Sequence, residues 1–369
     1  MNQLFRWDQT GLFLLALAAG ILPFAVPEVC AAALREGLTL CSGPLLLSLF
    51  PFLVVSRLLI QCPESDLLAL PFRLAAWGIG IRTPCAARVL CIGFLGGFAP
   101  AASAAAQAVR TGQLTAEEAD ALLPACICSG PSFVVLTVGQ SLLGSAELGV
   151  LLFASQITAN YLTAALLNRF AGVRSVKPES AAPASPAPPR LDEILADAAI
   201  TYCKLCGFIL FFRMLAAGAG ALLPDGAGTL CSILLEVCSG CDLASRTGRW
   251  GSLLCCAALS VQGLSVLLQV RTICPPEMTL RPLYRARMLH LPLSLALFYL
   301  LLPGGEADVF STLPARVLLM RRVPPDCALL VFAVCCMAAC TLRSGIRQVE
   351  QKQMARNAGG CCINSKTLL

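Results

Sequence analysis

Charged side chains are scarce in this chain of 369 residues, because Asp, Glu, Lys and Arg together make up only 13%. Soluble domains typically carry about 25% charged residues, so this composition excludes an ordinary soluble domain. Histidine is scarcer still, since His290 is the only one in the sequence. A tetrahedral zinc site needs four nitrogen or sulfur donors, and one histidine without grouped cysteine pairs does not supply them.

Motifs for nucleotide chemistry and for nucleophilic catalysis are also missing. The sequence contains no phosphate-binding loop, no dinucleotide fingerprint and no Ser-His-Asp set. We therefore expect no enzyme activity, no cofactor, no metal and no transport powered by the chain's own ATP hydrolysis. The formal net charge is +6, yet Lys and Arg are scattered through short connections and form no basic face. This pattern predicts headgroup anchoring and membrane topology and no nucleic-acid partner.

Hydrophobic residues make up 57% of the chain and gather in long runs. Most runs have about 20 residues, enough to cross a bilayer, and none alternates with the period of two typical of a barrel strand. We expect an all-α polytopic membrane protein with about nine or ten membrane segments and a cytoplasmic basic tail. The lipid bilayer is then expected to surround the protein. The expected membrane segments are 12–26, 38–60, 86–109, 121–143, 148–170, 196–223, 230–244, 253–273, 288–302 and 327–342.

The 21 cysteines lie mostly inside these apolar runs, where they are interpreted as small apolar fillers. Two CxxC spacings, which begin at Cys203 and Cys238, leave open the alternative of a thiol oxidoreductase. A helical CxxC without a second pair beside it is weak support for that chemistry.

A segment rich in Pro, Ala and Ser divides the chain at residues 172–190 and cannot pack a core. It predicts a solvated linker between two membrane parts. The expected organisation is an N-terminal helix and loop at 1–37, a first repeat at 38–171, the linker at 172–190, a second repeat at 191–303, a loop and C-terminal helix at 304–343, and a basic tail at 344–369.

Three blocks recur in the same order on both sides of the linker. FPFLVVSRLL aligns with CGFILFFRML and pairs Arg57 with Arg213. LGGFAPAA aligns with CSGCDLAS and SGPSFV with QGLSVL, which gives the pairs Gly97 with Gly240, Gly130 with Gly263, and Ser132 with Ser265. The conserved order predicts two related halves, which we expect to form an inverted repeat.

Four apolar segments carry residues that interrupt helices. They lie around Gly96, Gly97 and Pro100, around Ser129, Gly130 and Pro131, around Ser239 and Gly240, and around Gln262 and Gly263. Inside a bilayer a broken helix is tolerated only where protein or a wet cavity satisfies the freed backbone groups. Breaks at matching places in two halves indicate a secondary-transporter site. The alternative is a set of kinked helices that pack closed.

A helix that restarts in the membrane offers free N–H groups to an anion. The residues expected to bind a small anionic substrate are Gly97, Ser129, Gly130, Ser132, Arg57, Arg213, Gly240, Gln262, Gly263 and Ser265. For the two arginines, snorkelling to the headgroups is the alternative. Glu236 lies within an apolar run and is the candidate for ion coupling, with a purely structural pairing as the alternative.

The segment GQLTAEEADALL, at residues 112–123, begins with a polar turn. Thr115 followed three residues later by Glu118 predicts a capping box that starts a helix. The acidic residues here are therefore expected to serve helix initiation and not catalysis.

The blocks PFLVVSRLL, GGFAP, LTAEEADALL, CSGPSF, LLEVCSG, SVQGLSVLLQ and RARMLH together resemble the YlbJ-type sporulation integral membrane proteins, members of the nucleoside-recognition (Gate) domain superfamily. The resemblance implies a carrier of dipicolinic acid from the mother cell toward the forespore. It also implies location in the outer forespore or mother-cell membrane, where other sporulation membrane proteins are potential partners. The alternative function is a non-transporting scaffold or assembly factor for the spore envelope.

This chain departs from the family pattern in two blocks. It has Gly96 where the family usually has Ser before Gly-aromatic-Pro, and Cys128 in CSGP where the family has Asn or Ser. Both changes remove polar side chains from the region where the substrate is expected.

Overall fold

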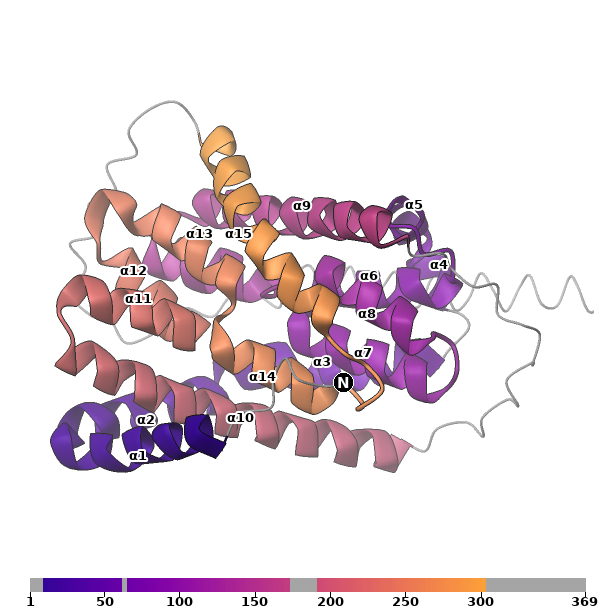
Figure 1. The fold of residues 1–369 in the computed structure, drawn as a ribbon. Coiled ribbons are helices and arrows are strands. Elements are labelled where there is room, and N and C mark those ends of the chain that lie inside the picture. Colours follow the sequence, from indigo (N-terminus) through magenta and orange to yellow (C-terminus); the bar gives the residue numbers. More distant parts are fainter. Residues whose placement is uncertain (1–8, 62–64, 173–190, 303–369) are drawn as a thin grey trace, which may run out of the picture.

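A computed structural model describes residues 9–61, 65–172 and 191–302 of the chain (Figure 1). Its described elements are all helices, with no strand among these residues. Four helical stretches are long and apolar enough to cross a membrane: Pro27–Ile60, Ala146–Ala171, Leu191–Leu222 and Gly248–Ile273. The expectation of an all-α membrane protein is therefore confirmed, while the count of nine or ten segments stays a prediction. The expected linker beyond Gly172, the segment 327–342 and the basic tail lie outside the described residues.

The N-terminal part contains five helices: α1 (Gln9–Ala25), α2 (Pro27–Ser42), α3 (Pro44–Gln61), α4 (Ser65–Leu68) and α5 (Leu70–Gly78). The expected segment at 38–60 lies within the apolar stretch Pro27–Ile60, which is divided at Gly43 into α2 and α3. Pro44 begins the next helix. Proline has no N–H for the helical hydrogen bonds, and it disfavours helical backbone in the residue before it.

The rest of the first half contains α6 (Pro84–Gly96), α7 (Phe98–Arg110), α8 (Ala116–Cys126), the π-helical η1 (Ser132–Leu142) and α9 (Ala146–Ala171). The second half contains α10 (Leu191–Leu222), α11 (Asp225–Leu235), α12 (Val237–Ser245), the short η2 (Gly248–Trp250), α13 (Gly251–Val261), α14 (Gly263–Ile273) and α15 (Arg281–Leu301).

The long helices α9 and α10 run along opposite sides of the molecule (Figure 1). Helices α6, α7 and α8 lie toward one end of these long helices, and α11, α12 and α13 lie toward the other. Helix α15 packs against α8, α9 and α13, so it contacts both halves. Large apolar side chains such as Phe24, Phe170 and Leu300 are exposed on the outside, as expected for a surface that faces lipid.

Two pairs of consecutive helices fold back on each other. Helix α6 packs on α7, and α11 packs on α12, with a single non-helical residue between the two helices of each pair, Gly97 and Glu236 respectively. At 1.5 Å per residue, α11 is about 16 Å long, roughly half of a hydrocarbon core of about 30 Å. We call these pairs the first hairpin (α6–α7) and the second hairpin (α11–α12).

The interruption expected around Ser239 and Gly240 is wrong in position, because both residues are helical and lie inside α12. The helix is interrupted at Glu236 instead. The Glu236 carboxylate accepts hydrogen bonds from the backbone N–H groups of Cys238 and Ser239, at 2.8 and 2.7 Å, so its side chain starts α12. Gly240 has a packing role: a Cβ there would lie 2.8 Å from Cα of Ile233 in α11.

The capping box at the start of α8 is confirmed. The backbone N–H of Glu118 donates to the Thr115 hydroxyl at 3.1 Å, and the backbone N–H of Thr115 donates to the Glu118 carboxylate at 3.2 Å. The Glu118 side chain also accepts a hydrogen bond from the Thr83 hydroxyl at 2.7 Å, which joins the start of α8 to the start of α6.

Candidate functional site

The tip of the first hairpin lies against the loop between α8 and η1. Gly97 at that tip has a φ of +80°, a backbone conformation that glycine adopts readily. A Cβ on Gly97 would lie 2.6 Å from the backbone nitrogen of Gly130, which is closer than any side chain permits. The two interrupted segments of the first half therefore meet backbone to backbone.

In the second half the hairpin tip also contacts a second interruption, here through a glycine that lies outside the hairpin. Gly263, at the start of α14, has a φ of +67°, and Gln262 before it has a φ of +65°. A Cβ on Gly263 would lie 3.0 Å from the backbone nitrogen of Glu236 and from the backbone carbonyl of Leu235. The tip of the second hairpin thus lies against the interruption between α13 and α14.

A cavity of about 50 Å³ lies where residues of both hairpins and of η1 and α14 come together; we call it the central cavity. Four of the predicted site residues line it, namely Ser129, Gly130, Ser132 and Glu236. Further lining comes from Leu45 and Leu49 of α3, Gly96 and Phe98 of the first hairpin, Phe133 of η1, Ile209 of α10, Val237 and Cys238 of the second hairpin, and Val266 and Gln269 of α14. The structure therefore brings together residues from before position 172 and from after position 191.

The polar groups of the central cavity differ between its two sides. Helices α7 and η1 begin without a side-chain cap, so no side chain occupies their first N–H groups on the side of the first half. The hydroxyls of Ser129 and Ser132 make no hydrogen bond to another described residue. On the other side, the start of α12 is already occupied by the Glu236 carboxylate. The cavity thus offers donors from one half and an acid from the other.

Three of the predicted residues support the cavity without lining it. Gly97 and Gly263 form the two backbone contacts described above. Ser265 accepts a hydrogen bond at 2.9 Å from the side-chain amide of Gln269, which does line the cavity. Gln262 does not line the cavity, and its side-chain amide donates to the Leu259 carbonyl at 3.1 Å.

Gln269 was not predicted as a site residue. It is buried, and its side-chain carbonyl oxygen has no hydrogen-bond partner among the described residues. Gln269 could have been recognised from the sequence, because its amide lies in the apolar run SVLLQV one helical turn after Ser265.

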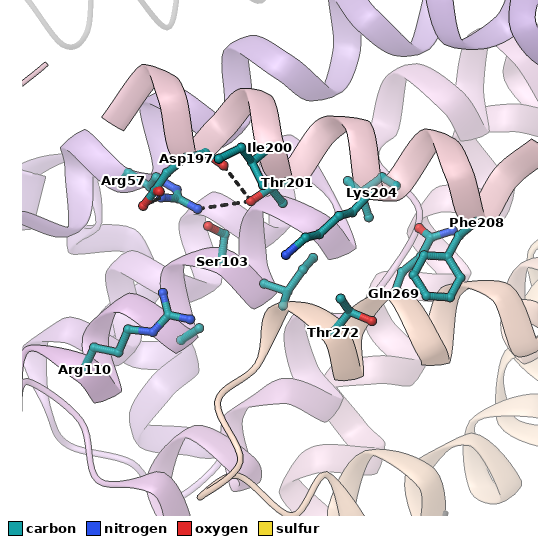
Figure 2. Close-up of a pocket in the computed structure, with 13 residues that line it drawn as sticks. Arg57, Ser103, Arg110, Asp197, Ile200, Thr201, Lys204, Phe208, Gln269 and Thr272 are labelled. Atoms are coloured by element: carbon teal, nitrogen blue, oxygen red, sulfur yellow. Dashed lines mark hydrogen bonds and ion pairs between the residues drawn. The ribbon is translucent and has the colours of Figure 1, made fainter. Parts of the chain in front are cut away.

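The two predicted arginines lie outside the central cavity, each with a carboxylate partner. Arg57 pairs with Asp197 at 2.5 Å, and Arg213 pairs with Glu36 at 2.7 Å. Arg57 lines a second cavity of about 160 Å³, here called the Arg57 cavity (Figure 2). Arg213 lines a third cavity of about 580 Å³, the Arg213 cavity, which is bordered by α2, α10, α11 and α12.

Arg287 in α15 is a further residue that was not predicted as part of the site. It is buried and donates to the backbone carbonyls of Ile127, at 2.6 Å, and of Ser260, at 3.4 Å. These carbonyls lie at the carboxyl ends of α8 and α13, where interrupted helices leave carbonyls without helical partners. The Asn160 amide also donates to Ile127, at 3.2 Å. Arg287 therefore binds the interrupted helices of both halves together.

The site is a small, largely apolar cavity between two sets of interrupted helices, with a few polar side chains and an acid in its lining. No protein-family model, no curated protein and no solved structure matches the chain.

Proposed function

We propose that this chain is a membrane carrier for a small organic anion and that the central cavity is its binding site. The observation that carries the proposal is the meeting of two helical hairpins and two further helix interruptions around one cavity. Interrupted backbone is costly in lipid, so it is retained where it serves a polar ligand or a pathway.

We interpret the two halves as repeats of inverted topology. Each half contains a hairpin followed by a second interrupted pair, in the order α6–α7 then α8–η1, and α11–α12 then α13–α14. A glycine with positive φ makes the contact between the two parts in each half, Gly97 from the hairpin tip in the first and Gly263 from the second interruption in the second. Such pairs, set at opposite ends of the long helices, suit a carrier that opens the central cavity to one side of the membrane at a time.

Dipicolinate is the substrate we propose first, on the strength of the resemblance to YlbJ-type proteins. It is a small aromatic dianion that would suit the uncapped starts of α7 and η1 and the free hydroxyls of Ser129 and Ser132. The sporulation setting and the movement toward the forespore belong to the same proposal.

Glu236 is proposed to couple transport to an ion. An ionised carboxylate at the cavity edge repels an anionic substrate, whereas a protonated one does not. Entrance of the substrate together with a proton would remove this repulsion, and release would restore it. The same residue holds the start of α12, so its protonation would also loosen the second hairpin.

Uptake into liposomes tests the proposal. The purified full chain is reconstituted, and accumulation of radiolabelled dipicolinate is compared with that of empty liposomes. Ser132→Ala is expected to lower uptake, and Ser141→Ala, which changes an exposed hydroxyl on the same helix, is the matched control. Uptake no higher than in empty liposomes rejects the carriage of dipicolinate.

The scaffold alternative makes the opposite prediction for site variants. A scaffold would use its helices only as packing surfaces, so Ser132→Ala would leave sporulation intact. Spores of a deletion strain that contain normal dipicolinate would also contradict the carrier proposal in this form.

A further inference from the structure

The Arg57 cavity holds an excess of positive charge. Among the described residues its charged groups are Arg57, Arg110, Lys204 and Asp197, which are three cations and one carboxylate. Figure 2 shows the side chains of Arg110 and Lys204 extending toward the same hollow from α7 and α10. Neither of them makes an ion pair with a described residue.

The Arg213 cavity, by contrast, is charge-balanced. Its charged residues in the described part of the chain are Glu36, Arg213, Asp242 and Arg246. They form two ion pairs, Arg213 with Glu36 at 2.7 Å and Arg246 with Asp242 at 2.8 Å. The two cavities therefore differ in their attraction for anions, although each contains one of the two arginines that the sequence blocks align.

The Arg57–Asp197 pair is unequal in burial. The Arg57 side chain is only 11% exposed, while that of Asp197 is 62% exposed. Arg57 also donates to the Thr201 hydroxyl at 3.2 Å, which helps to hold the guanidinium in place. The exposed carboxylate loses little hydration when paired and is free to return to water, so another carboxylate can replace it on Arg57.

Gln269 connects the Arg57 cavity to the central cavity, because it lines both. Its buried carbonyl oxygen has no partner among the described residues. A polar side chain therefore stands between the cationic hollow and the residues Ser129 and Glu236.

From this arrangement we infer that the Arg57 cavity is a capture site for a small soluble dianion, in which Asp197 occupies the place of a ligand carboxylate on Arg57. The charges match, since a dianion that replaces Asp197 on Arg57 would bring two negative charges to a cavity lined by Arg57, Arg110 and Lys204. The inference rests on the proposed function only for the passage of the captured anion onward to the central cavity.

Equilibrium binding to the full chain in phosphatidylcholine nanodiscs tests the inference. The probes are dipicolinate and picolinate, which share a ring and differ by one carboxylate. We expect tighter binding of dipicolinate, weakened about two- to fivefold by Lys204→Gln or Arg110→Gln, since exposed charge pairs have effects of this size. Asp197→Asn is expected to tighten dipicolinate binding, because the competing carboxylate is gone.

The matched control is Asp242→Asn, which neutralises a carboxylate in the Arg213 cavity and should leave dipicolinate binding unchanged. Equal effects of Asp197→Asn and Asp242→Asn on dipicolinate affinity would overturn the inference. Unchanged dipicolinate affinity in Lys204→Gln and Arg110→Gln would overturn it as well.

A second experiment tests whether a lipid occupies the cavity, by replacing part of the phosphatidylcholine with phosphatidylglycerol. If phosphatidylglycerol abolished dipicolinate binding to wild type but not to Lys204→Gln, the cavity would be assigned to a lipid phosphate and the inference would be overturned.

Failure of this inference is distinguishable from failure of the proposed function. Normal dipicolinate uptake with no effect of the Arg57-cavity variants would reject the capture site alone. Dipicolinate binding that follows the expected pattern, without any uptake into liposomes, would reject the carrier and leave the capture site standing.

Discussion

Gly97 and Gly130 lie so close together that a Cβ on Gly97 would be 2.6 Å from the backbone nitrogen of Gly130. No side chain fits at this contact, and the φ of +80° at Gly97 independently favours glycine. The position of the first hairpin against the loop before η1 is thus set by two backbones. Ser129 and Gly130 line the central cavity from that loop, so the contact also sets one wall of the proposed site.

Gly97→Ala is expected to destabilise the protein by more than the strain of its φ alone. At the φ of +80° and ψ of −161° of Gly97, a non-glycine residue costs about 1–3 kcal/mol, and the new methyl group also forces the two backbones apart. The measurement is the unfolding temperature of the detergent-purified protein. Gly112→Ala is the control, because Gly112 has a φ of +70° but nothing within 4 Å of its Cβ position. Equal losses in the two variants would show that the contact with Gly130 contributes nothing.

Several features of the fold follow from local sequence. The apolar runs predicted an all-α membrane protein, and Thr115 with Glu118 predicted the start of α8, because capping needs only residues three positions apart. Gly97 and Gly263 were also recognisable, since glycine is the residue that adopts positive φ without cost. The predicted interruption of the second hairpin, at Ser239 and Gly240, was a few residues away from the actual one at Glu236. Glutamate, unlike glycine or proline, has no backbone preference that marks a helix interruption in the sequence.

The pairings within the site could not be read from sequence in the same way. Arg57 and its partner Asp197 are 140 positions apart, and Arg287 lies 160 positions from Ile127. Nothing local in RARMLH tells which arginine is buried, because Arg285 and Arg287 differ only in the helix face they occupy. Such contacts depend on how helices pack, which a single sequence does not specify.

Glu236→Gln is expected to remove the stimulation of dipicolinate uptake by an inward proton gradient. The amide resembles the protonated acid in shape and charge, so it no longer responds to pH. Liposomes are loaded at a higher internal pH, and initial uptake rates with and without the gradient are compared for wild type and variant. A variant stimulated as strongly as wild type would exclude Glu236 as the coupling residue.

Glu236→Ala is expected to be less stable than Glu236→Gln. Loss of a side chain that caps a helix typically costs about 0.5–2 kcal/mol, and the N–H groups of Cys238 and Ser239 would both lose their acceptor. The unfolding temperatures of the two purified variants provide the comparison. Equal stability would mean that neighbouring groups satisfy these N–H groups after truncation.

Thr115→Ala tests the start of α8 apart from the cavity. The variant loses the acceptor for the Glu118 N–H and should be destabilised by about 1 kcal/mol, whereas Thr115→Ser keeps the hydroxyl and should stay near wild type. Unfolding temperature is again the readout. Similar losses for both variants would point to the threonine methyl group and not to the capping box.

Arg287→Gln is expected to be the most damaging of these changes. The buried guanidinium donates to Ile127 and Ser260, and the shorter amide cannot reach both carbonyls. A buried polar group left without its partner costs about 1–3 kcal/mol, and here two interrupted helices are affected. The control is Arg285→Gln, which changes an exposed arginine on the same helix. Because Arg287 joins α8 of the first half to α13 of the second, its loss should lower both the unfolding temperature and dipicolinate uptake. Arg285→Gln should lower neither, and an equal response of the two variants would mean that α15 acts only through the total charge of its basic start.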